Sequence, residues 1–291
     1  MSVEMNILCY QCTLNKNLEK AASLGDLEKA TVFGKALMEL LLRTPKDISS
    51  PVLVPQINGL YKEIFDLDPP DFTKDKADSN RFVMERYQDL VRRVESEEDS
   101  LFAGLQMAIL GNYLDFAALA GKVSFQELEQ SLEQARNIQL DEEVYAALQE
   151  DLSKGKKLLY LTDNAGEIGF DRIFAEQIQK KYPHLQITFC VRGYPAVNDA
   201  TREDAQAVGI PFDVIDNGSN IGGTELSQIS QTALTALQQA DVIIAKGMGN
   251  TETLYGCGYN IYYAFLVKCQ RFVQQFGKPL MTPMLVREKS E

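Results

Sequence analysis

Side chains able to bind a divalent cation follow a short apolar segment near the middle of the chain. Residues 158–161 predict a strand buried on both faces, and residues 163–167 (Asp-Asn-Ala-Gly-Glu) follow it before a helix-like pattern. In an open α/β sheet, ligands bind beyond the carboxyl ends of the strands, at the N-termini of the following helices. Oxygen-bearing side chains at that position indicate a hard cation. The structural alternative is that Asp163 or Asn164 caps the helix and Glu167 completes a capping box.

Three later predicted strands, at residues 187–191, 212–215 and 242–245, also end in polar residues. The residues that follow them are Arg192, Asn198 and Asp199; Asp216 and Asn217; and Lys246, Asn250 and Glu252. Strands that alternate with helical segments predict βαβ units around a parallel sheet. Because the carboxyl ends of parallel strands lie on one edge, we expect these side chains to converge in one crevice.

The residue types at these strand ends suit a metal ion and a phosphate. Two aspartates roughly neutralise a divalent cation and an amide oxygen adds a neutral ligand. Lys246, with Arg192 as a second donor, would then balance the charge of a phosphate. The chain contains no Gly-x-x-x-x-Gly-Lys-Ser/Thr motif and only 1 histidine, and its strand ends do not spell Gly-x-Gly-x-x-Gly. These absences argue against a P-loop nucleotidase, most histidine-based acid–base chemistry and a dinucleotide site.

The composition is that of an ordinary globular protein, with 45% hydrophobic and 24% charged residues among 291. A formal net charge of -12 argues against nucleic acid as a partner, although a small anion needs only a local positive site. The 5 cysteines do not form the pattern of a secreted disulfide framework. With no signal-like N-terminus and no apolar run of about 20 residues, we expect a soluble, cytoplasmic protein that does not bind membranes. The sequence leaves the oligomeric state open.

Residues 1–153 are predicted to form an N-terminal helical region, and residues 154–291 the α/β domain that carries the site. One continuous helical pattern covers residues 17–42. Two polar features interrupt the helical half. Cys9 and Cys12 have the spacing of a metal or redox pair, but a zinc site needs more ligands. Asn112 and Asp115 share one face of an apolar helix, where they need polar partners or a ligand.

Three motifs occur in an order typical of one family. They are Asp-Asn-x-Gly-Glu-x-x-x-Asp at residues 163–171, Arg-Gly-x-Pro-x-x-Asn-Asp at 192–199 and Lys-Gly-x-Gly-Asn-x-Glu at 246–252. On these residues the chain resembles the Domain of Unknown Function 89 family, the metal-dependent damage-control phosphatases, which includes a relative described as an acidic-residue methyltransferase. Gly-Asn-x-x-Asp-Phe at 111–116, Cys-x-x-Cys at 9–12 and Lys-Cys at 268–269 match its stand-alone microbial branch. The resemblance covers nearly the whole chain.

The resemblance implies a three-layer α/β/α, Rossmann-like domain with a mostly parallel sheet and an N-terminal all-helical region. By position it implies that Asp163, Asn164 and Asp199 bind Mn, Co, Ni or Mg, and that Lys246 contacts the phosphate. It implies a pocket lined by Glu167, Asn198, Asn112, Asp115, Asn250 and Glu252. The implied partner is a small phosphorylated metabolite, such as a sugar phosphate or a damaged metabolite. Cys9, Cys12 and Cys269 would meet as a structural cluster or a second metal site, and Met248 departs from the polar residue of many members.

Three functions remain open from the sequence. In a phosphatase, either a metal-bound water or Asp163 itself could attack phosphorus. A protein carboxyl methyltransferase would need a methyl-donor loop, and the acidic residues 163–167 do not resemble a glycine-rich one. A sugar-phosphate sensor would bind its ligand without turnover. Phosphate release and binding of S-adenosylmethionine distinguish these functions.

Overall fold

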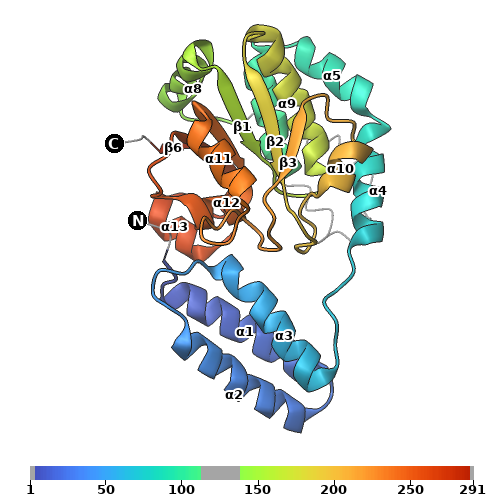
Figure 1. Cartoon of the computed structure of the whole chain (residues 1–291), viewed down its shortest axis with the longest axis vertical. Helices are drawn as coiled ribbons and strands as arrows, with labels where there is room; N and C mark the ends of the chain where they lie inside the picture. The colour runs from blue at the N-terminus through green and yellow to red at the C-terminus, as the bar shows by residue number, and fades with distance from the viewer. Residues whose placement is uncertain (1–3, 113–137, 289–291) are drawn as a thin grey trace.

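The computed structural model describes residues 4–112 and 138–288, and its centre is a six-stranded sheet (Figure 1). The strands are β1 (Lys157–Leu161), β2 (Gln186–Val191), β3 (Asp213–Asp216), β4 (Val242–Lys246), β5 (Ile261–Leu266) and β6 (Pro283–Glu288). Their order is β3-β2-β1-β4-β5-β6, in which β6 alone runs antiparallel to its neighbour. The predicted mostly parallel sheet is therefore confirmed.

Helices cover both faces of the sheet. They are α4 (Thr73–Met84), α5 (Tyr87–Glu95), α6 (Ser100–Gly111), α8 (Glu142–Lys154), α9 (Glu167–Lys181), α10 (Arg202–Ala207), α11 (Gln231–Gln239), α12 (Gly247–Leu254) and α13 (Gln270–Phe276). Strand side chains alternate between the faces, so Tyr160 of β1 packs in one core with Phe174 of α9. Leu161 packs in the other core with Leu237 of α11. This arrangement is the expected three-layer α/β/α fold.

The N-terminal helices form a separate core. They are α1 (Ile7–Ser23), α2 (Leu27–Arg43), the short 3₁₀ helix η1 (Ser50–Leu53) and α3 (Val54–Phe65). The buried side chains of Phe33, Leu37 and Tyr61 hold them together. Helices α4–α6 and α8 instead contribute side chains to the core on one face of the sheet. None of the described helices is long and apolar enough to span a membrane.

The continuous helix predicted over residues 17–42 is wrong, because two helices share that segment. Gly25 has a φ of +86°, a conformation that ends a helix, and the Asp26 side chain accepts from the Lys29 N–H at 2.9 Å to begin the next one. Helix α11 begins at Gln231, where the Ser230 side chain accepts from the Ala233 N–H.

Close packing between α6 and α9 brings the end of α6 to the strand ends. A Cβ atom on Gly111 would lie only 2.9 Å from Cγ of Glu167, so glycine permits the contact. Asn112 follows directly and reaches the carboxylates after β1. Figure 1 shows α1–α3 lying beyond the edge of the sheet where the strand-to-helix loops gather.

A candidate metal and phosphate site at the strand ends

The loops after β1 and β2 are joined by main-chain contacts. Asn164 and Asp199 form an isolated antiparallel bridge, and the Ala200 N–H donates to the Asp163 carbonyl oxygen at 2.7 Å. The Ala165 N–H donates to the Asn198 carbonyl oxygen at 2.9 Å. The three predicted metal ligands, from loops separated by more than 30 residues, therefore meet at one place as expected for the carboxyl edge of a parallel sheet.

Asp163 is held by two amides. Its Oδ2 atom accepts from Asn112 Nδ2 at 2.9 Å and from Asn164 Nδ2 at 2.8 Å. Burial raises the pKa of Asp163 well above its ordinary value, and the charges of Glu167 and Asp199 raise it further. Such crowding of carboxylates is a feature that a bound cation would relieve.

Arg192 is buried against Asp199. Its Nε atom donates to Asp199 Oδ2 at 2.6 Å and its Nη2 atom to Asn250 Oδ1 at 3.3 Å, and its side chain is 0% exposed. Burial raises the pKa of Asp199, although the Arg192 guanidinium opposes that rise. The third guanidinium nitrogen, Nη1, is buried without a hydrogen-bond partner among the described residues. An anionic ligand could accept a hydrogen bond from this buried, positively charged nitrogen and so satisfy it.

Asn250 holds the site together rather than lining a pocket. It is fully buried, and its Nδ2 atom donates to the carbonyl oxygens of Thr162 at 3.0 Å and Lys246 at 2.7 Å. Its Oδ1 atom also accepts from the Thr224 hydroxyl at 2.8 Å. Asn250 therefore ties the ends of β1 and β4 to the loop after β3.

Lys246 does not present its ammonium group to a ligand, in contrast to the sequence prediction. Its side chain is 0% exposed, and Nζ lies 2.7 Å from each of three acceptors: Glu167 Oε1, Asp171 Oδ1 and the Ala108 carbonyl oxygen. These partners use all three ammonium donors. Burial alone would lower the pKa of Lys246, but Asp171 and Glu167 raise it above the ordinary value, so the side chain stays charged. Lys246 is a buried positioning residue.

Glu167 links Lys246 to the metal-type ligands. Its Oε2 atom accepts from Asn112 Nδ2 at 3.1 Å and from Asn164 Nδ2 at 2.9 Å. Burial alone would raise the pKa of Glu167, but Lys246 and the two amides hold it below its ordinary value. Glu167 therefore orients both amides as a charged acceptor. Its role is not limited to completing a capping box at the start of α9.

Several supporting residues were missed by sequence reasoning. Asn80 of α4 accepts from the Gly166 N–H at 2.7 Å and donates to Asp204 Oδ1 at 2.8 Å. Lys76 pairs with the other oxygen of Asp204 at 2.7 Å. No local signal marks these residues, because the sequence of α4 has the composition of an exposed helix. Asp171 had a usable signal, since it lies four residues after Glu167 and so shares its helix face.

Two predicted residues lie elsewhere. Glu252 faces a cavity together with Cys9, Cys12 and Cys269, rather than the carboxylates after β1 and β2. Within the described residues, no group of three or more histidine, cysteine or acidic side chains is arranged to hold a metal, either at these thiols or at the strand ends, where the predicted third ligand is the amide of Asn164. Asp115 lies outside the described residues.

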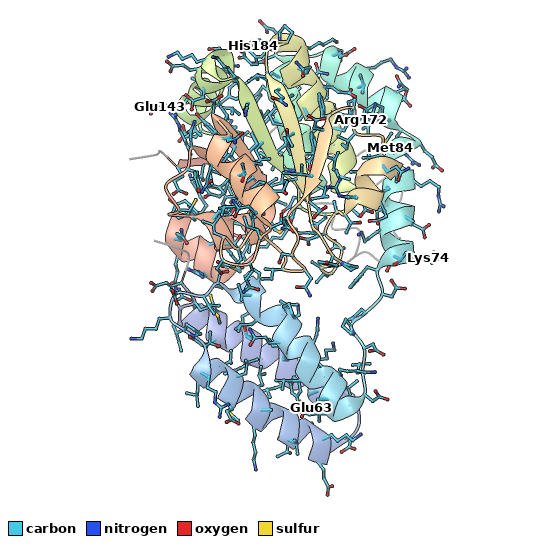
Figure 2. All side chains as sticks on the ribbon, in the orientation of Figure 1. Glu63, Lys74, Met84, Glu143, Arg172 and His184 are labelled. Atoms are coloured by element: carbon cyan, nitrogen blue, oxygen red, sulfur yellow. The ribbon has the colours of Figure 1, made fainter. Side chains whose placement is uncertain are left out.

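The single histidine lies away from this site. Figure 2 labels His184 at the end of the α/β part opposite to α1–α3, in the loop that precedes β2.

Gly247 allows the carboxylate of Asp163 to lie against the start of α12. It has a φ of +77°, and a Cβ atom there would lie 2.0 Å from Asp163 Oδ2. We expect Gly247→Ala to displace this carboxylate. For any reaction at this site, kcat/KM should then fall by at least about 100-fold, because small misplacements of catalytic groups carry penalties of that size. Gly258→Ala is the matched control, since Gly258 has a φ of +84° and nothing within 4 Å of an added Cβ. Equal activity in the two variants would contradict the placement of Asp163.

The donor set fits a divalent cation. Asp163 and Asp199 supply carboxylates, and Asn164 uses its amide nitrogen on Asp163 and Glu167, which leaves its oxygen for an ion. The Oδ1 atom of Asn112, beside Asp163, is buried without a hydrogen-bond partner among residues 4–112 and 138–288. An acceptor-rich site with crowded carboxylates matches a hard metal ion better than an anion.

The fold and the site together define a three-layer α/β protein with an acidic, metal-type centre at the carboxyl ends of its strands. A family model for the damage-control phosphatase ARMT1-like domain matches residues 6–282, and the chain belongs to this family. An uncharacterised protein of Methanocaldococcus jannaschii is 34% identical, with coverage of 95% of this chain and 93% of that one. A damage-control phosphatase of Archaeoglobus fulgidus is 29% identical, with coverage of 94% and 96%. The crystal structure of a DUF89-family protein from Pyrococcus horikoshii matches with a TM-score of 0.80 and 26% identity, over 98% of this chain and 99% of that one.

Proposed function

We propose that the protein is a metal-dependent phosphatase that hydrolyses small phosphate monoesters, such as sugar phosphates or damaged phosphometabolites. The observation that carries this proposal is the pairing of two crowded carboxylates, Asp163 and Asp199, with a buried guanidinium nitrogen of Arg192 that lacks a partner among the described residues. Membership of a damage-control phosphatase family supports it.

Each residue has a distinct role in this proposal. Asp163, Asn164 and Asp199 would hold a divalent ion such as Mn, Co, Ni or Mg. The bound ion would supply positive charge and a water of lowered pKa. Arg192 is fixed at Nε by Asp199 and at Nη2 by Asn250, which leaves Nη1 as the donor that would bind a phosphate oxygen. Because this guanidinium is already rigid and desolvated, it stabilises phosphate charge with little rearrangement.

Lys246 supports the reaction indirectly in this scheme. It neutralises Glu167 and Asp171, and Glu167 in turn orients the amides of Asn112 and Asn164. In this proposal the phosphate is contacted by Arg192, which the sequence indicated as a second donor, and not by Lys246.

The test is a screen of metals against phosphate esters with protein freed of metal by a chelator. We expect phosphate release only after a divalent ion is restored, and a loss of at least about 100-fold in kcat/KM for Arg192→Gln, because a buried charged donor is removed. Arg92→Gln is the charge-matched control, since Arg92 is an exposed arginine of α5 away from the site. Absence of metal-stimulated release across the panel would contradict the proposal.

A further inference from the structure

A cavity of about 440 Å³ lies between helix α1 and the connection from β5 to α13. Its lining includes the polar side chains of Gln11, Asn15, Glu252, Lys268 and Arg271, together with several thiols. The volume falls in the range of sites that bind small organic molecules. The cavity is therefore large enough for the organic part of a metabolite.

The cavity and the carboxylate of Asp163 both adjoin helix α12, through Glu252 and Gly247 respectively. The main-chain N–H of Lys268 donates to Met248 Sδ at 3.1 Å, and Met248 follows Gly247, which packs on Asp163. Glu252 lies one helical turn after Met248 and lines the cavity. The first turn of α12 therefore separates the predicted metal ligands from the cavity, and an ester whose phosphate is held at Arg192 would cross this turn to place its organic part there.

The lining is locally positive in a chain whose net charge is -12. Lys268 and Arg271 carry two positive charges, and Glu252 is the one carboxyl group among the described lining residues. Burial raises the pKa of Glu252 to about 7, although Arg271 opposes this rise, so the carboxyl group is only partly ionised at neutral pH. The cavity would therefore attract an anionic group.

The thiols contribute packing rather than reaction chemistry. Cys9 Sγ accepts from Arg271 Nη1 at 3.4 Å, which fixes the guanidinium in the wall of the cavity. Burial raises the pKa of Cys269, so this side chain stays a neutral thiol and a poor nucleophile. Sulfur atoms of this kind suit the carbon skeleton of a ligand, and the amides of Gln11 and Asn15 suit its hydroxyl groups.

We propose that this cavity is a leaving-group subsite that selects phosphate esters carrying a second anionic group, a carboxylate bound by Lys268 and Arg271. The inference rests on the proposed phosphatase function and narrows its substrates to phosphorylated carboxylic acids, such as sugar acids. Inorganic phosphate or a bare alkyl phosphate would leave the cavity empty.

The test compares esters that differ only in the carboxylate, at two chain lengths. Gluconate 6-phosphate is paired with glucitol 6-phosphate, and 3-phosphoglycerate with glycerol 3-phosphate. We expect kcat/KM to favour the carboxylate ester by at least tenfold at one of these lengths, as a charge-assisted contact implies. Arg271→Gln and Lys268→Gln should each lower that preference by at least threefold, and Glu252→Gln at pH 8 should raise it. Lys278→Gln removes a charge from an exposed residue outside the cavity and should leave the preference unchanged.

The measured quantity is the ratio of kcat/KM for two esters on one preparation. Partial misfolding does not change this ratio, because loss of folded protein lowers both rates equally. A kcat/KM ratio near one at both chain lengths would contradict the proposed subsite and leave the phosphatase function intact. A ratio that is unchanged in both Arg271→Gln and Lys268→Gln would do the same. If the parent protein hydrolyses none of the four esters and no other monoester with any metal, the proposed function fails and the subsite fails with it.

Discussion

Asp163→Asn is expected to abolish metal-dependent phosphate release, with a loss of at least about 1,000-fold in kcat, while the metal-free protein stays as stable as the parent or becomes more stable. The loss follows because Asp163 is a predicted metal ligand and the nearest carboxylate to the amides of Asn112 and Asn164. The unchanged or increased stability follows from repulsion: burial and the charges of Glu167 and Asp199 raise the pKa of Asp163, so its charge destabilises the metal-free fold.

The two effects are separated by thermal unfolding with and without Mn²⁺. The parent should show a rise in Tm on addition of metal, because a ligand that binds only the folded state stabilises it. Asp163→Asn should begin at an equal or higher Tm and show no such rise. Asp213→Asn should behave like the parent. A metal-free Asp163→Asn protein that is clearly destabilised would mean that the carboxylate serves the fold and not a cation.

Lys246→Met is expected to destabilise the protein by about 3–5 kcal/mol, because it leaves two buried carboxylates, Glu167 and Asp171, without their cation. A lysine that contacts phosphate would behave differently: its loss would raise KM and lower kcat while the metal-free protein stayed folded. Urea unfolding of the metal-free protein therefore distinguishes a positioning residue from a ligand-binding one.

Two further variants control this prediction. Lys278→Met removes an exposed lysine and should change the free energy of unfolding by less than about 0.5 kcal/mol. The triple variant Lys246→Met, Glu167→Gln, Asp171→Asn removes the unpaired charges and should recover part of the lost stability. Full stability of Lys246→Met in the absence of metal and substrate would return the lysine to its predicted contact with phosphate.

The sequence was sufficient to predict the sheet and the meeting of its loops. Apolar runs that end in polar residues mark buried parallel strands, and the geometry of such a sheet places Asp163, Asn164 and Asp199 at one edge. The two partners of Lys246 were predictable in principle. Glu167 and Asp171 are four residues apart on one helix face, so the helix presents both carboxylates to the same neighbouring side chain. Reading Lys246 as a free strand-end cation overlooked these two carboxylates.

Other features depend on contacts between distant segments. Asn80 reaches Gly166 across 86 residues, and Arg271 reaches Cys9 across 262, so no local pattern reveals either contact. Cys9 and Cys12 have a metal-like spacing, yet the spacing could not show that the thiols face an open cavity with Glu252. The break at Gly25 and Asp26 was visible as a glycine and a capping residue, but the apolar periodicity on both sides hid it.

The central claim is that Asp163 and Asp199 hold a divalent ion at the ends of β1 and β2. Calorimetric titration of the chelator-treated protein with Mn²⁺ tests this claim most directly. We expect saturable binding to the parent protein and to Asp213→Asn, and loss of that binding in both Asp163→Asn and Asp199→Asn while both variants remain folded. Binding of Mn²⁺ to Asp163→Asn and Asp199→Asn with the affinity of the parent would contradict it.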